Sequence, residues 1–278
     1  MGSEIALVFA LAGNDVLLSD VSQSNLDRAR ARLGSLLEKG VARGLYRSDQ
    51  AEAGLSRIRT TVDLEAFSDR ELVTEAIFEA EALKADLVAR LDSICNPACL
   101  IASNTSTIPI SSLAAAVSAE RRSRFIGTHY FSPVSRMKLV EVIPAFDTCP
   151  DTADTIMDIM RDIGKVPVKV KDVAGFAVNR MLHMFIIEAV KLVEEGVATP
   201  EDIDTACQLG LGHPIGPFAL MDAVTSSLCV QAQEIMQDAY GERFRPPPLL
   251  KQRVRAGYAG GKGLPGWYEQ GARLAPAS

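Results

Sequence analysis

The sequence predicts an α/β domain with a largely parallel sheet, followed by an all-helical domain. Over residues 1–172, short apolar runs typical of buried strands alternate with stretches whose apolar residues recur at helical spacing. Such alternation predicts a parallel sheet with helices packed against it. After residue 172 no run has the pattern of a strand. We therefore predict two domains, residues 1–172 and 173–278.

In the first domain, each predicted helix has its own signal. Residues 3–12 place apolar side chains on one face, and Gly13 follows as a typical helix stop. A charged amphipathic stretch predicts one helix or a pair of helices over 23–44, and leucines at a spacing of four predict another over 76–91. Shorter helices are predicted over 110–117 and 152–163, and strands over 16–18, 58–61, 72–74, 100–102, 125–128, 139–143 and 166–170.

The second domain begins with a long apolar helix over 175–193. Its apolar residues nearly fill the circumference, which predicts burial within the chain or between two chains. Thr199 and Pro200, followed by two acids, form a typical helix start. Further helices are predicted over 217–240 and 248–256.

Composition narrows the function classes. The apolar fraction of 47% and charged fraction of 23% are those of an ordinary globular protein. The net charge of −6 argues against non-specific binding to nucleic acid or an anionic membrane. No run of 18 apolar residues could span a membrane. Five cysteines without a CxxC pair indicate reduced thiols, so we expect a cytoplasmic protein without a metal site.

A histidine and a carboxylate stand out in the first domain. His129 directly follows the run 125–128, and Glu141, twelve residues later, lies in the middle of the run 139–143. A carboxylate in an apolar strand is costly to bury unless it is paired, and a histidine polarised by a carboxylate is a general-base arrangement. The spacing by itself fits a purely structural pair as well.

Other polar residues lie at predicted strand ends, where parallel sheets bind ligands. Asp20 is placed to accept the ribose hydroxyls of an adenine nucleotide, or to form a turn. The polar cluster 103–106 can present hydroxyls to a ligand, or cap the next helix. Asn179, in the apolar helix, needs a partner, which could be a ligand or the sheet.

A Rossmann-like dinucleotide site also needs a strand and a G-x-G-x-x-G loop before the first helix. Gly2 lies 18 residues before Asp20, close to the spacing expected for the third glycine. We therefore expect the first strand and the first two glycines to lie upstream of Met1. Ser3 and the helix amides can still bind an anion through the helix dipole.

Over essentially its whole length, the sequence resembles the 3-hydroxyacyl-CoA dehydrogenases, particularly the 3-hydroxybutyryl-CoA type. The resemblance implies a Rossmann-like NAD-binding domain, a helical domain for substrate binding and dimerisation, and hydride transfer between C3 of a short-chain 3-hydroxyacyl-CoA and NAD. The matching stretches, in the family's order, are 17–20 (LLSD), 73–79 (VTEAIFE), 103–106 (SNTS), 129–143, 175–180 (GFAVNR), 201–204 (EDID) and 212–218 (GHPIGPF).

The resemblance also implies roles for single residues. His129 would take the 3-hydroxyl proton, Glu141 would orient and stabilise it, and Ser106 and Asn179 would hold substrate oxygens. Ser132 stands where the family often has Asn. The implied NAD contacts are Gly2, Asp20, Glu79, Lys84, Ser106, Ser132 and Lys262.

These implications predict an enzyme of fatty acid metabolism with an acyl-CoA substrate and NAD as cofactor. We expect a homodimer formed through the helical domain, with no nucleic acid, membrane or metal partner. Two alternatives remain open: an NAD-dependent dehydrogenase of a small 3-hydroxy acid without CoA, and a catalytically inactive, dimerising fragment.

Overall fold

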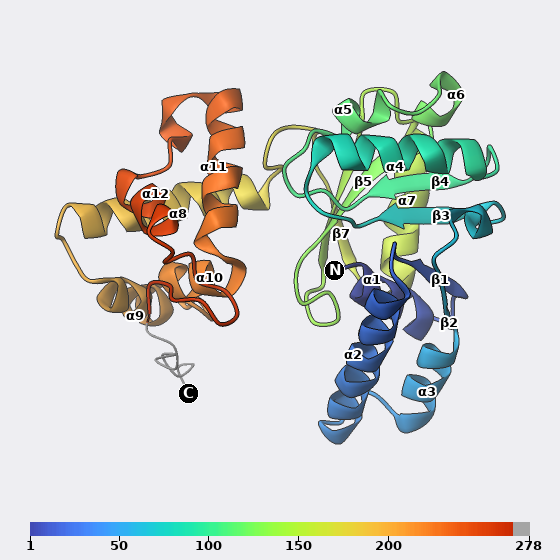
Figure 1. The fold of residues 1–278 in the computed structure, drawn as a ribbon, viewed down its shortest axis with the longest axis horizontal. Coiled ribbons are helices and arrows are strands. Elements are labelled where there is room, and N and C mark those ends of the chain that lie inside the picture. The colour runs from blue at the N-terminus through green and yellow to red at the C-terminus, as the bar shows by residue number, and fades with distance from the viewer. Residues whose placement is uncertain (269–278) are drawn as a thin grey trace. The chain divides into compact units, whose positions relative to one another are not determined.

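The computed structural model describes residues 1–268 and divides the chain into two compact units, Met1–Val173 and Ala174–Ser278 (Figure 1). The first unit combines strands and helices. In the second unit, the described residues form helices and connecting loops. The predicted α/β sheet followed by a helical region is therefore confirmed.

The strands of the first unit form two sheets. A five-stranded sheet has the order β3-β4-β5-β6-β7, in which β6 runs antiparallel to β5 and the other neighbours are parallel. A separate parallel pair, β1-β2, forms the second sheet. The strands are β1 (Val16–Ser19), β2 (Ile58–Thr61), β3 (Leu72–Glu75), β4 (Leu100–Ser103), β5 (Phe125–Tyr130), β6 (Leu139–Pro144) and β7 (Val166–Lys169).

The helices of the first unit follow the predictions with four differences, one of which is the unpredicted η1. The predicted helix over 76–91 begins only at Glu81, because Ile77 donates its N–H to the Glu75 carboxylate and accepts a bond from Lys84. Helix α3 was not predicted, since it buries only two small residues, and the short α6 was also missed. The helices are α1 (Gly2–Leu11), α2 (Gln23–Ala42), α3 (Ser48–Ser56), η1 (Leu64–Phe67), α4 (Glu81–Ile94), α5 (Ile110–Ala114), α6 (Ala119–Arg122) and α7 (Pro150–Asp162).

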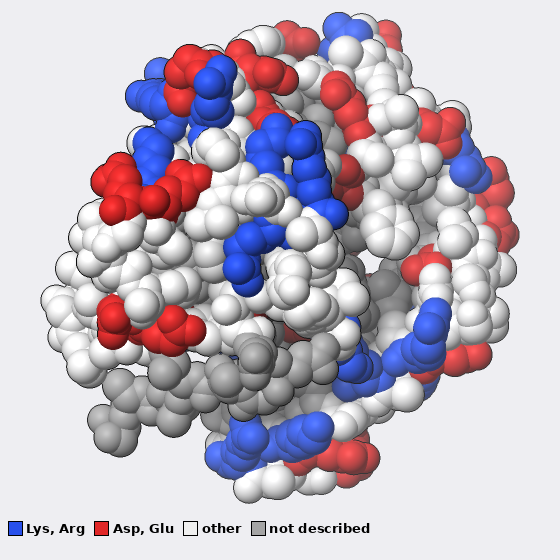
Figure 2. Space-filling model, turned by 60° about the vertical axis from the view of Figure 1, so that its left-hand side comes forward, with Lys and Arg blue, Asp and Glu red and all other residues white. Residues whose placement is uncertain are grey.

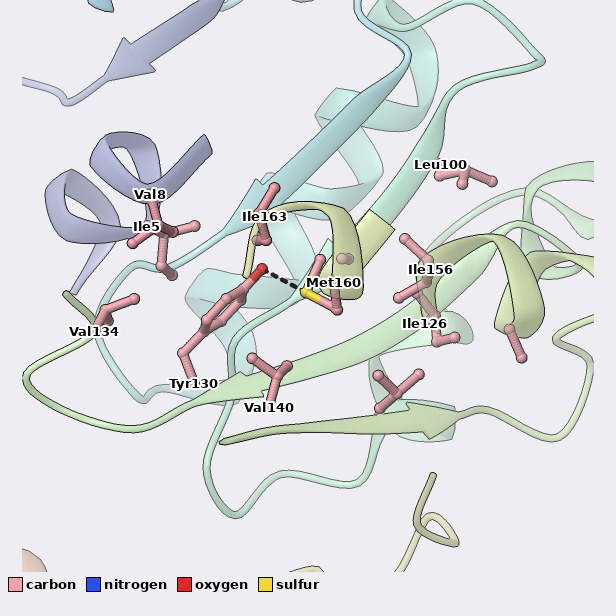
Figure 3. Packing of buried hydrophobic residues seen from close by; sticks show 13 residues of the cluster. Ile5, Val8, Leu100, Ile126, Tyr130, Val134, Val140, Ile156, Met160 and Ile163 are labelled. Carbon is pink, nitrogen blue, oxygen red and sulfur yellow. Dashed lines mark hydrogen bonds between the residues drawn. The ribbon is translucent and has the colours of Figure 1, made fainter. Parts of the chain in front are cut away.

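Helix α1 contributes to two apolar cores. Ile5 and Val8 pack with residues of the five-stranded sheet and α7, in the cluster drawn in Figure 3. Leu7 and Ala10 pack instead with α2, α3 and β2. Figure 3 also shows the Tyr130 hydroxyl pointing to Met160, whose sulfur lies 3.1 Å away and accepts its hydrogen bond.

The second unit is built around α8, whose predicted start was three residues too early. Gly175 and Phe176 have φ angles of 71° and 46°, which a right-handed helix cannot contain. Ile186, Ile187 and Val190 are buried in this unit. The helices are α8 (Val178–Glu194), α9 (Pro200–Leu211), α10 (Pro217–Val224), α11 (Ser226–Tyr240), η2 (Glu242–Phe244) and α12 (Pro248–Arg255).

The next two features concern membrane spans and metal-binding groups in the described part of the chain. No helix over residues 1–268 has the length and apolar character needed to cross a membrane. Within the same residues, no group of three or more His, Cys, Asp or Glu side chains is arranged to hold a metal ion.

Candidate active site

His129 and Glu141 are direct neighbours on adjacent antiparallel strands. The β5-β6 register pairs them, so both side chains leave the sheet on the same face. His129 Nδ1 lies 2.8 Å from Glu141 Oε2, and the two residues are 4% and 1% exposed. His129 lies inside β5, one residue before its end, rather than after the strand as expected. The sheet thus brings together two residues that are twelve apart in sequence.

This geometry decides which imidazole nitrogen is available for chemistry. An ionised carboxylate only accepts hydrogen bonds, so Glu141 keeps the proton of the neutral ring on Nδ1. Nε2 is then an acceptor, and it lies 3.1 Å from Ser106 Oγ. The Phe131 ring lies against the imidazole, with 4.6 Å between ring centroids. The arrangement can accept and return a proton at Nε2 while Glu141 stabilises the charged ring.

Ser106 lies in a loop after β4 that is fixed by one carboxylate. Glu79 Oε1 accepts hydrogen bonds from Thr105 Oγ1 (2.6 Å), Ser106 N (2.8 Å), Thr107 N (2.9 Å) and Thr107 Oγ1 (3.0 Å). Burial acts to raise the pKa of Glu79. The hydrogen bond from Thr105, the Lys84 ammonium and the two backbone amides outweigh that effect and hold the pKa below its ordinary value. Glu79 is therefore an ionised anchor for the loop.

Lys84 and Glu75 complete a buried network beside this anchor. The Lys84 side chain is fully buried, and its Nζ lies 2.7 Å from Glu75 Oε1, 3.2 Å from Ile77 O and 3.4 Å from Glu79 Oε2. Ser103 Oγ donates to the other Glu75 oxygen at 2.5 Å. The three protons of the ammonium group are thus matched by three acceptors in the protein.

Glu75 was missed as a site residue by sequence reasoning. The signal that could have found it is the alternation along β3, where Val73 and Glu75 are buried and their neighbours are half-buried. With a period of two, a carboxylate on the buried face requires a partner. Lys84, nine residues later, is that partner.

Asp20 follows β1 directly and is half-buried. It accepts hydrogen bonds from Ser22 N (3.2 Å) and Asn25 Nδ2 (2.7 Å). Among the described residues, both bonds end on Oδ1, so Oδ2 can accept a bond from a ligand. This arrangement fits the ribose of a dinucleotide, for which a carboxylate at this position of the fold is suited.

The remaining predicted contacts lie at separate positions. Gly2 begins α1, and a Cβ added there would lie 3.5 Å from Ala76 Cβ, beside the loop after β3. Ser132 is exposed in the loop after β5. In the second unit, Asn179 is the second residue of α8, and Lys262 is exposed between two glycines of positive φ. The structure thus joins His129, Glu141, Ser106, Glu79 and Lys84 in one connected set of contacts.

Comparison with known proteins gives a consistent result along the chain. Residues 1–173 match the family model of the 3-hydroxyacyl-CoA dehydrogenase NAD binding domain, and residues 175–270 match that of the C-terminal domain. A probable 3-hydroxybutyryl-CoA dehydrogenase of Deinococcus radiodurans is 41% identical over 274 residues, covering 97% of this chain and 96% of that protein.

Two solved structures are similar over almost the whole chain. FadB2 of Mycobacterium tuberculosis superposes with a TM-score of 0.92 at 36% identity, covering 96% of this chain and 94% of that one. The (S)-3-hydroxybutyryl-CoA dehydrogenase PaaH1 of Ralstonia eutropha has a TM-score of 0.91 at 34% identity, with the same coverage. With both family models matched in order, this chain belongs to the 3-hydroxyacyl-CoA dehydrogenase family.

Proposed function

We propose that this protein transfers a hydride reversibly between C3 of a short-chain 3-hydroxyacyl-CoA and NAD, with His129 as the acid/base. The observation that carries the proposal is the buried His129–Glu141 pair, whose remaining ring nitrogen faces Ser106. Bound NAD supplies the hydride acceptor. His129 Nε2 takes the proton of the C3 hydroxyl, and Glu141 stabilises the resulting imidazolium. Ser106 Oγ, next to Nε2, is placed to hydrogen-bond the same substrate oxygen.

Residues 1–172 are proposed to hold NAD, as the family relationship implies. Asp20 binds the adenosine ribose through Oδ2, and Gly2 allows the start of α1 to approach an anion. Contacts with the cofactor are likewise proposed for Ser106, Ser132, Glu79 and Lys262. Because the Lys84 side chain is fully buried, we place its influence on the cofactor through Glu79 rather than through a direct bond.

Residues 173–278 are proposed to contribute to substrate binding, through Asn179, and to form a homodimer. Met181 on α8 and Leu209 on α9 are 68% and 74% exposed, and Leu211 is 63% exposed. Apolar surface of this kind is suited to a contact with a second chain. Both signs of charge are interspersed on the face drawn in Figure 2, unlike the single-sign basic surface typical of proteins that bind nucleic acid. We further propose a cytoplasmic role in fatty acid metabolism.

The proposal is tested by following NADH formation from NAD and 3-hydroxybutyryl-CoA, with free 3-hydroxybutyrate as a parallel substrate. We expect saturable activity with the thioester, loss of that activity in His129→Gln, and little change in the matched control His213→Gln. Activity with the free acid alone would favour a dehydrogenase that does not use CoA. Failure to bind NAD saturably would indicate a catalytically inactive protein.

A further inference from the structure

The position of Ser106 is set by a single oxygen atom of a distant side chain. Four donors from three consecutive residues, Thr105 to Thr107, converge on Glu79 Oε1 at 2.6–3.0 Å. The backbone N–H of Ser106 is one of them. With the main chain fixed on both sides, the side-chain torsion of Ser106 directs Oγ, which lies 3.1 Å from His129 Nε2.

A second contact ties the same loop to the strand that carries His129. Asn104 Oδ1 accepts a hydrogen bond from Tyr130 N at 2.9 Å, and Asn104 N donates to Glu75 O at 2.8 Å. Tyr130 is the residue next to His129 and is anchored in the core by Met160. The separation of Ser106 and His129 is therefore controlled from both ends.

Glu79 is held by a buried ion-pair network that stability alone does not explain. Lys84, fully buried, is shared between two carboxylates, those of Glu75 and Glu79. Buried ion pairs of this kind are often no more stabilising than apolar residues of the same volume, because the charges lose their hydration. The network instead orients the Glu79 carboxylate and keeps it ionised, so that Oε1 can accept all four hydrogen bonds.

We infer that Glu79 is a positioning residue of the hydride-transfer reaction, which holds Ser106 on His129, and that Lys84 and Glu75 support it. This inference rests on the proposed roles of His129 and Ser106. Beside its proposed contact with the cofactor, Glu79 acts on the reaction through the loop, so the loss of its bonds to the loop should lower kcat. A carboxylate that acted through its cofactor contact alone would weaken NAD binding and leave kcat nearly unchanged.

The test is a double-mutant cycle with Glu79→Gln, Ser106→Ala and the double variant. For each protein, kcat and KM are measured with the thioester substrate, and the NAD Kd is measured by titration. Misplacing a reacting group by about 1 Å costs on the order of 10²-fold in rate, so we expect Glu79→Gln to lower kcat by ~10–100-fold. The NAD Kd reports separately on the proposed contacts of Glu79 and Ser106 with the cofactor. In the Ser106→Ala background, Glu79→Gln should have almost no further effect, because the two residues act as one unit.

A second variant guards against a folding defect in Glu79→Gln. Thr107→Val keeps the shape of the side chain and the Thr107 N–H bond but removes one of the four donors. We expect a smaller fall in kcat, also absent in the Glu79→Gln background. The NAD Kd should change less than about 2-fold, because the Glu79 carboxylate stays in place. The matched control is Glu65→Gln, an exposed glutamate of η1, which should behave as the unsubstituted protein.

The outcomes separate the inference from the proposed function. Additive effects of Glu79→Gln and Ser106→Ala, or an NAD Kd raised ~10-fold at unchanged kcat, would overturn the positioning role. An unsubstituted protein that does not oxidise the thioester would overturn the proposed function instead. Hydrogen exchange of the Ser106 and Thr107 amides would still report on the loop: faster exchange in Glu79→Gln supports its anchoring by Glu79, and unchanged exchange contradicts it.

Discussion

Replacing Glu141 by Gln separates the charge of this residue from its shape. The side chain stays buried next to His129, and its amide oxygen can still accept a hydrogen bond from Nδ1, which lies 2.8 Å from Oε2 in the unsubstituted protein. The tautomer needed for proton transfer at Nε2 is therefore kept. What disappears is the negative charge that stabilises His129 once it has taken the substrate proton.

The size of the effect follows from this geometry. Opposite unit charges about 4 Å apart attract by about 4 kcal/mol at an effective dielectric constant of about 20. The neutral hydrogen bond that remains is worth about 1 kcal/mol. The transition state thus loses about 3 kcal/mol, which corresponds to a fall in kcat of about 10²-fold, since each 1.36 kcal/mol is about tenfold.

Steady-state kinetics with 3-hydroxybutyryl-CoA, and fluorescence titration with NAD, measure the two sides of this prediction. We expect kcat to fall by about 10²-fold while the NAD Kd changes by less than about 2-fold. Glu120→Gln, an exposed glutamate in α6, is the control. An equal loss in turnover and NAD affinity, or a kcat within about 3-fold of the unsubstituted protein, would refute the reasoning and make the pair structural.

Three further predictions concern the cofactor and stability. Asp20→Ala should weaken NAD binding about tenfold and reduce the ratio of NAD to NADP affinity in binding titrations, because it removes the carboxylate proposed to accept the ribose hydroxyls. An unchanged affinity ratio would count against this role. Lys84→Met should lower the free energy of unfolding in urea by about 3–5 kcal/mol, since it leaves the buried Glu75 carboxylate and the half-buried Glu79 carboxylate without their cation; a loss below about 1 kcal/mol would contradict the network. Burial lowers the pKa of His183 from 6.5 to about 4. Neutral His183 is thus favoured in the folded state, so stability is fully present above pH ~6.5 and falls by about 3 kcal/mol as the pH drops toward 4. Unfolding curves at several pH values should show this slope, and His183→Gln should lack it.

Local patterns were enough to predict most of the elements but not all their limits. The strands were found because buried parallel strands are short apolar runs, such as β4 and β5. The start of α4 was misplaced because two tertiary contacts of Ile77 hold residues 76–80 out of the helix. Helix α3 buries only Ala51 and Gly54, and so it lacks the apolar face that identifies a helix in a sequence.

The candidate site was predictable in part for a similar reason. His129 and Glu141 could be predicted because a carboxylate in an apolar strand needs a partner. The β5-β6 register places His129 directly beside Glu141. The contact between Ser106 and His129 depends on a loop whose shape is imposed by Glu79. No local signal contains that information, because the donors and the acceptor are 26–28 residues apart.

Helix α1 contributes to two apolar cores of the first unit, and each core stabilises a different sheet. A two-stranded sheet is marginally stable by itself, so β1-β2 depends on Leu7 and Ala10, which pack it from the inner side of α1. Truncating Leu7 should loosen the end of β1 that carries Asp20, while β5 and β6 remain folded around their own core. Given the proposed roles of Asp20 and His129, substitutions on opposite faces of one helix should change cofactor affinity and proton transfer independently.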